Sequence, residues 1–89
     1  MLVKNAISRA IKHGMIPEQT VRGIIIFNPV TGLKVSAHVR DGETSGQWRV
    51  HSKTPDRPEF DEFNSAYVDN LKLALRMIST AKQAIRHAQ

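Results

Sequence analysis

Two stretches of the chain decide its fold: Lys34–Arg40 reads KVSAHVR, and residues 47–53 read QWRVHSK. Both alternate apolar and polar side chains, which is the period of a β-strand with one buried side and one solvent-facing side. The turn-forming sequence DGETSG separates them, so we predict that they pair as an antiparallel hairpin. The outward positions of this hairpin carry six basic side chains and no carboxylate: Lys34, His38, Arg40, Arg49, His51 and Lys53.

One further strand precedes this hairpin. Residues 17–20, PEQT, are polar and are expected to form a connection. The run VRGIIIF at 21–27 is rich in β-branched residues and predicts a strand. It leads into NPVTG at 28–32, whose asparagine, proline and glycine are typical of a turn. The three predicted strands therefore follow one another as an antiparallel meander.

Helices are predicted at both ends of the chain. Apolar residues spaced by three and four over 2–13 indicate a short amphipathic helix, and Gly14 suits its end. The same spacing from about Glu59 to the C-terminus indicates a long helix, and Pro58 suits its first turn. The predicted fold is α+β in the order α-β-β-β-α, a three-stranded antiparallel meander packed against a long C-terminal helix, with a short N-terminal helix.

The composition fits one small globular domain spanning residues 1–89, because 40% of the residues are hydrophobic. The chain has no cysteine, which excludes disulfides, thiolate metal sites and thiol nucleophiles. No apolar run approaches the roughly 20 residues of a membrane-spanning helix, and the N-terminal residues lack the apolar core of a secretory signal. We expect a cytoplasmic protein that does not associate with membranes.

The charge of the chain favours a polyanionic partner. Thirteen lysines and arginines against eight acidic residues give a net charge of +5, which is typical of proteins that bind nucleic acid. If Val39 lies opposite Trp48, then Lys34 lies opposite Lys53, and such like-charged neighbours destabilise a sheet by a few tenths of a kcal/mol or more. Bound phosphates would relieve that repulsion. The alternative is an ordinary solvated face, since antiparallel sheets commonly turn one side to water.

We therefore predict that the six basic side chains of the hairpin contact phosphates. Arg40 and Arg49 are the candidates for base contact, because a guanidinium group binds guanine through two hydrogen bonds. Four further basic residues are predicted to flank this surface: Arg22, Lys4, Arg9 and Lys12. The last three gather near a helix N-terminus, where helix stability does not favour positive charge.

A protein partner is the second possibility. If Phe27 lies opposite Leu33, then Ile24 and Ile26 project on the same side as the basic residues, where either the N-terminal helix covers them or they contact another chain. The predicted C-terminal helix adds Ile78 and Ile85 to this interface. A helix of about thirty residues would span roughly 45 Å, well beyond a seven-residue strand of roughly 23 Å, so its far end is expected to pack against either the N-terminal helix or the second subunit of a homodimer.

No catalytic or cofactor site is predicted. His38, His51 and Ser36 could lie together on the sheet, but the surrounding positive charges oppose metal binding. The sequence GETSG lacks the lysine and spacing of a phosphate-binding loop. Trp48 and Tyr67 are expected in the core, so the basic face would lack the aromatic platform typical of proteins that bind single strands. We expect a protein that is not an enzyme and needs no metal or cofactor.

The predicted order of elements is similar to that of double-stranded RNA-binding domains. Those domains place lysines at the start of the last helix, whereas this chain has the acidic sequence PEFDEF at 58–63. A three-stranded sheet followed by a helix is also similar to the arm-binding domains of phage integrases, which read DNA with the sheet face. The resemblance is one of architecture, and it implies DNA binding through the sheet rather than membership of either family.

Together these observations predict a non-enzymatic nucleic-acid-binding module, with duplex DNA favoured over RNA. The alternative is a small accessory or inhibitor protein, of the kind found in phages and mobile elements, that grips a protein partner through an apolar strand and helix surface. The two hypotheses differ in which side chains reach the surface of the sheet. That distribution depends on strand register.

Overall fold

The computed structural model describes residues 1–51 and 66–88, and for Ala66 and the residues after Ser79 it describes only the backbone. It is an α+β fold with two helices and an antiparallel sheet, as predicted. In chain order the elements are α1 (Val3–Lys12), β1 (Ile16–Gln19), β2 (Gly23–Phe27), β3 (Lys34–Arg40), β4 (Glu43–Thr44), β5 (Trp48–His51), β6 (Ala66–Val68) and α2 (Leu71–Ala88).

The sheet has the strand order β1-β2-β3-β5-β6, with β4 paired to β3. The predicted meander of β2, β3 and β5 forms the centre of the sheet. The sheet has more strands than the three that were predicted, because β1, β4 and β6 also pair with it. Residues 17–19, expected to form part of a connection, belong to β1, which pairs with β2 so that Glu18 lies opposite Ile25. This strand was not predicted because it contains polar side chains and Pro17, but polar side chains and proline are both tolerated on the edge of a sheet.

The C-terminal helix begins later than predicted. The segment Ala66–Val68, expected to be helical, pairs with β5 as strand β6. Asn70 then caps α2, because its side-chain oxygen accepts a hydrogen bond of 2.7 Å from the backbone N–H of Leu73. The 18 residues of α2 span about 27 Å, so the length of this helix no longer argues for a second subunit.

The register of β2 against β3 differs by one residue from the predicted one. Phe27 lies opposite Lys34 rather than Leu33, and Ile24 lies opposite Ala37. Because successive side chains alternate between the two faces, this slip reverses the face of every residue in β2. Ile24 and Ile26 therefore lie in the core, with 1% and 0% of their surfaces exposed. The expectation that they project beside the basic residues was wrong.

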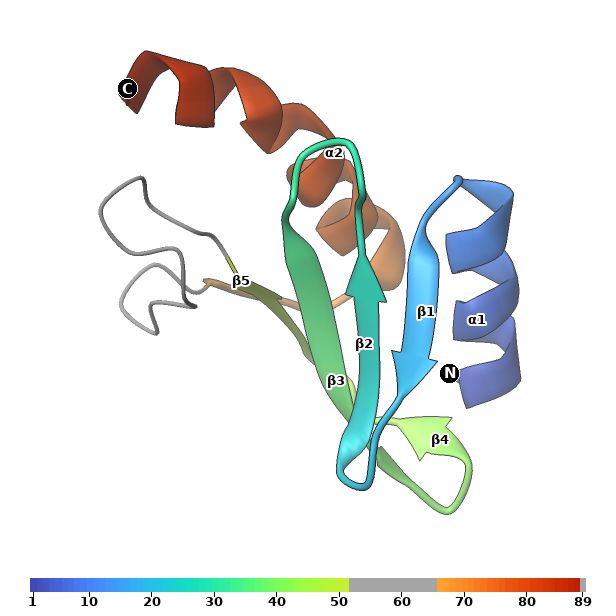
Figure 1. Ribbon diagram of the computed structural model, residues 1–89. Coiled ribbons are helices and arrows are strands. Elements are labelled where there is room, and N and C mark those ends of the chain that lie inside the picture. Colours follow the sequence, from blue (N-terminus) through green and yellow to red (C-terminus); the bar gives the residue numbers. More distant parts are fainter. Residues whose placement is uncertain (52–65, 89) are drawn as a thin grey trace.

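Both helices pack on the same face of the sheet. In Figure 1, α2 crosses behind the hairpin of β2 and β3, and α1 lies beside β1. The buried residues form one hydrophobic core: Ala6, Ala10, Met15, Ile24, Ile26, Leu33, Val35, Ala37, Trp48, Val50, Leu71, Ala74, Leu75 and Ile78. Neither α1 nor α2 covers the opposite face of the sheet. We call that face, as far as the structure describes it, the open face.

The pairing of β3 with β5 keeps the predicted faces but changes the predicted partners. Val35 lies opposite Val50 and Ser36 opposite Arg49, a shift of two residues, which leaves the alternation intact. The cause is the short strand β4. It follows a tight turn at Asp41–Gly42, where φ is 54° and 78°, values typical of a two-residue hairpin turn. The sequence DGETSG is thus a turn, a strand and the start of a link to β5.

The turn between β2 and β3 is tied to α2 by a buried asparagine. The side-chain oxygen of Asn28 accepts hydrogen bonds from the backbone N–H groups of Val30, at 2.9 Å, and Thr31, at 3.4 Å. Its side-chain nitrogen donates to the carbonyl oxygen of Ile78 at 3.4 Å. Asn28 is 7% exposed, so these bonds satisfy a polar group that would otherwise be costly to bury.

Replacing Gly23 by alanine should destabilise the fold by about 2 kcal/mol or more. A Cβ atom at this position would overlap the backbone carbonyl oxygen of Ala37 on the neighbouring strand, and neither strand can yield without losing its register. Gly46→Ala is the matched control, because a Cβ there meets nothing within 4 Å. Urea unfolding followed by the fluorescence of Trp48, the sole and buried tryptophan, measures both. Equal stabilities would contradict the close approach.

Replacing Asn28 by aspartate should also destabilise the fold. The substitution keeps the acceptor for Val30 and Thr31 but turns the donor to Ile78 into an oxygen facing a carbonyl oxygen, in a buried position. We expect a loss of about 1–3 kcal/mol of unfolding free energy. Asn28→Ala, which removes all three bonds, should lose at least as much. An aspartate variant as stable as the unaltered protein would show that the bond to α2 contributes nothing.

Candidate functional site

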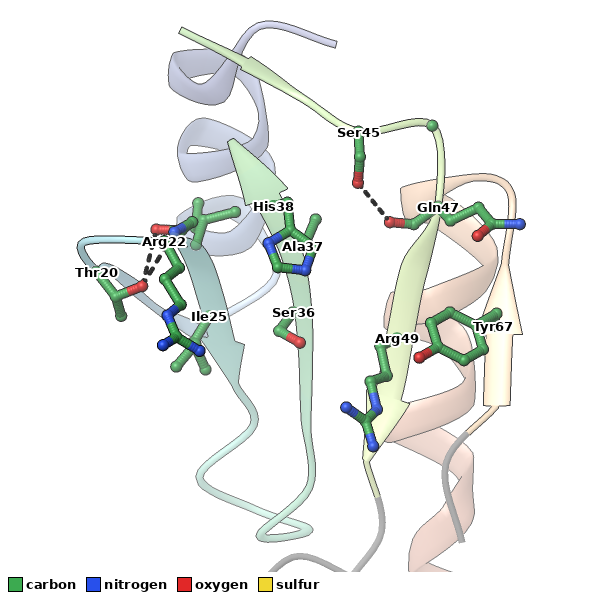
Figure 2. Close-up of a pocket in the computed structure, with 13 residues that line it drawn as sticks. Thr20, Arg22, Ile25, Ser36, Ala37, His38, Ser45, Gln47, Arg49 and Tyr67 are labelled. Atoms are coloured by element: carbon green, nitrogen blue, oxygen red, sulfur yellow. Dashed lines mark hydrogen bonds between the residues drawn. The ribbon is translucent and has the colours of Figure 1, made fainter. Parts of the chain in front are cut away.

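A hollow of about 470 Å³ lies on the open face, and residues from β2, β3, β5, β6 and their connections line it. Figure 2 shows its main side chains. Three of them are basic, namely Arg22, His38 and Arg49, and one is aromatic, Tyr67. No aspartate or glutamate is among the lining residues. The hollow therefore joins positive charge with an aromatic ring.

Arg22 is placed on one rim of the hollow by the turn between β1 and β2. The backbone N–H of Thr20 donates to the carbonyl oxygen of Gly23 at 2.7 Å, and the N–H of Gly23 donates to the Thr20 hydroxyl at 3.1 Å. The N–H of Val39, on β3, donates to the carbonyl oxygen of Arg22 at 3.2 Å. The backbone of Arg22 is thus fixed, while its side chain is exposed.

The link between β4 and β5 forms another rim. The N–H of Ser45 donates to the carbonyl oxygen of His38 at 2.8 Å, and the Ser45 hydroxyl donates to the carbonyl oxygen of Gln47 at 3.1 Å (Figure 2). The pairing of β3 moves from β4 to β5 across this link, with a two-residue change of register. Residues 45–47 therefore line the hollow instead of continuing the ladder.

Tyr67 is the functional candidate that the sequence prediction misplaced. It was expected on the C-terminal helix, facing the hydrophobic core, but it lies on β6 opposite Arg49, with 63% of its surface exposed. The guanidinium carbon of Arg49 lies 5.9 Å from the centre of the tyrosine ring, within the range of a cation–π interaction. The Asp69–Asn70 pair was the signal in the sequence, because asparagine before an apolar run marks a helix start.

Ser36 and His51 form a direct contact on the open face. The Ser36 hydroxyl lies 2.8 Å from Nε2 of His51, so Ser36 approaches His51 rather than His38. A nucleophilic serine also needs donors that stabilise an oxyanion and a group that orients the histidine, and we assign this contact only the role of orienting His51. Within residues 1–51 and 66–88, no group of three or more histidine and acidic side chains is arranged to hold a metal ion.

The remaining basic residues of the hairpin lie at the two ends of the open face. Lys34 and His51 are half-buried and lie opposite one another. Arg40 is exposed at the other end and lies opposite Glu43. Together with Glu18, which lies opposite Ile25, Glu43 shows that the expectation of an acid-free face was wrong beyond the hollow. Lys53 lies outside the described residues.

The predicted flanking residues of α1 lie on the other side of the sheet. Lys4, Arg9 and Lys12 are exposed on this helix, which packs on the core face. Arg9 and Lys12 belong to the last turn of α1, where the helix dipole favours positive charge. The expectation that all three gather near a helix N-terminus was therefore wrong for two of them. None of the three lines the hollow, although Arg9 lines an adjoining hollow together with Ser45 and Gly46.

The predicted protein interface is not assembled on the surface. Ile24, Ile26 and Ile78 are all buried in the core. The side chain of Ile85 lies outside the part of α2 whose side chains are described. An apolar strand and helix surface built on these residues would require the core to open.

Comparison of the chain with protein-family models, with curated proteins and with solved structures finds no match. Neither α1 nor α2, as described, is both long and apolar enough to cross a membrane. The functional interpretation of this protein therefore depends on the chemistry of its surfaces.

Proposed function

We propose that the protein binds nucleic acid through the hollow of the open face, without catalysing a reaction. The observation that carries this proposal is the exposed ring of Tyr67 beside Arg49, in a hollow that Arg22 and His38 also line. An aromatic ring offers a stacking surface to a base, and the basic side chains offer contacts to the phosphates that flank it. A hollow of about 470 Å³ falls within the usual size of a small-ligand pocket.

The same geometry favours an unpaired strand over a duplex. The predicted preference for duplex DNA depended on a basic face without an aromatic side chain, but Tyr67 lies on that face. A base can stack on a tyrosine ring only when it is not enclosed in a helix. Duplex reading also requires an element that projects into a groove, whereas these side chains surround a recess.

The alternative of an accessory protein with an apolar interface gains no support from the described residues that were predicted to form that interface. Its isoleucines Ile24, Ile26 and Ile78 fill the core. The residues at the centre of the open face are instead basic, aromatic or hydroxyl-bearing, apart from the half-buried Ile25. This composition resembles a protein surface that binds nucleic acid more closely than it resembles the apolar centre of a protein–protein interface.

Replacing Tyr67 by alanine should weaken binding to single-stranded oligonucleotides by roughly tenfold to a hundredfold, because one stacked base contributes about 1–3 kcal/mol. Tyr67→Phe keeps the ring and should retain most of the affinity. Fluorescence anisotropy with labelled DNA and RNA strands measures both variants and shows which sugar is preferred. If Tyr67→Ala binds as tightly as the unaltered protein, stacking at this position is excluded.

Replacing Arg22 by glutamine should leave one phosphate of the bound strand without its cation. For single strands, the slope of log K against log salt falls by about 0.7 for each phosphate that the protein no longer neutralises. Val21→Gln is the matched control, since Val21 is fully exposed in the same turn and carries no charge. Binding is measured over a range of salt concentrations with single-stranded and duplex DNA of the same sequence. Tighter binding to the duplex, or a slope that Arg22→Gln leaves unchanged, would contradict the proposed mode.

A further inference from the structure

A second hollow, of about 490 Å³, lies between the two helices, on the core side of the sheet. We call it the helix groove. Its lining comes from the end of α1, the residues that follow it, and the first half of α2: Arg9, Lys12, His13, Met15, Lys72, Leu75, Arg76 and Ser79. No residue lines both this groove and the hollow of the open face, although a third hollow, lined by Arg9, Lys72, Ser45 and Gly46, adjoins both. The two are therefore distinct surfaces.

The helix groove is lined by basic side chains around an apolar base. Met15 and Leu75 are buried, with 6% and 4% of their surfaces exposed. Five of the eight lining residues are arginine, lysine or histidine, and none is acidic. These basic residues are exposed, and like charges gathered from two neighbouring helices repel one another. An anion in the groove would remove that repulsion.

Helix stability explains only half of this arrangement. Arg9 and Lys12 are in the last turn of α1, where the helix dipole favours them, but Lys72 is the second residue of α2. The first turn of α2 carries no acidic residue, and a positive charge there opposes the dipole. Asp69 lines an adjoining hollow together with Arg9 and Lys72, yet among the described residues it forms an ion pair with neither.

We propose that the helix groove is a second nucleic-acid site, which holds the phosphate backbone of a strand. This inference rests on the proposed function and extends it, because the protein then contacts nucleic acid on both sides of its sheet. The groove offers charge but no exposed aromatic ring, so it binds without stacking and without preference for base. One chain can thereby hold two short strands at once, or two distant segments of one long strand.

The shape of the groove selects this occupant over an anionic membrane. A bilayer surface is broad and flat, so it would meet only the exposed basic side chains at the rims of the groove and not its base, where Met15 and Leu75 are buried. A nucleic-acid backbone is narrow and carries a charge at every nucleotide, so it can follow a groove and neutralise several cations in succession.

The test measures how many short strands one chain binds, using single-stranded DNA of about six nucleotides, within the usual range of site sizes. Isothermal titration should give two strands per chain for the unaltered protein and one for the double variant Lys12→Gln, Lys72→Gln. Each single variant should lower the salt slope measured with a longer strand by about 0.7. Lys4→Gln is the control, since Lys4 is exposed on α1, lines neither hollow, and loses the same charge.

Failure of this inference and failure of the proposed function give different results. One strand per chain, with binding that depends on Tyr67 but not on Lys12 and Lys72, overturns the helix groove and leaves the open face standing. Binding that depends on Lys12 and Lys72 but not on Tyr67 supports the groove and overturns the open face. The absence of binding to any strand overturns both. Cosedimentation with vesicles containing anionic lipid, lost on Lys72→Gln while oligonucleotide binding persists, overturns the groove as a nucleic-acid site.

Discussion

The structure depends on the register of β2 against β3. With Ile24 opposite Ala37 and Ile26 opposite Val35, four apolar side chains lie on one face, and both helices pack against that face. A slip of one residue would exchange these isoleucines for Ile25 and Gly23 and would leave α2 facing a poorer surface. Two features fix the register. At one end Gly23 admits the carbonyl of a neighbouring strand, and at the other the Asn28 turn bonds to α2.

This register also determines which chemistry the open face presents. Because the isoleucines face the helices, the opposite side of the central strands carries Ser36, His38 and Arg49, and the alternation extends across β5 to Tyr67. The helices need only one apolar face for a core of this size, so the other face is available for polar and basic groups. Core formation and the candidate site are therefore two results of one alternation.

Much of the central sheet was predictable from the sequence, because apolar and polar side chains alternate without interruption in β3 and β5. The two-residue difference between the predicted and observed pairing leaves each side chain on its predicted face. The face of β2 was not predictable, since four consecutive apolar residues, Ile24 to Phe27, fit either side equally well. The edge strands β1 and β6 were not predicted, for a different reason. Strand β1 is held by backbone hydrogen bonds, which a polar sequence forms as readily as an apolar one. Strand β6 was mistaken for helix because the spacing of Tyr67 and Leu71 also fits a helix. The weak signal at Asn70 was the physical evidence that the helix starts after β6.

The distribution of positive charge follows from the layers of the fold rather than from the linear sequence. Arg9 and Lys12 precede the basic strands by only a few tens of residues, yet the core lies between them and Arg49. They meet Lys72 and Arg76 instead, which are distant in sequence, because α1 and α2 pack on the same face. Six arginines and lysines are thereby divided between two recesses, Arg22 and Arg49 on the open face and Arg9, Lys12, Lys72 and Arg76 in the helix groove. Under the proposed function, the two recesses would hold two segments of a polyanion on opposite sides of one sheet.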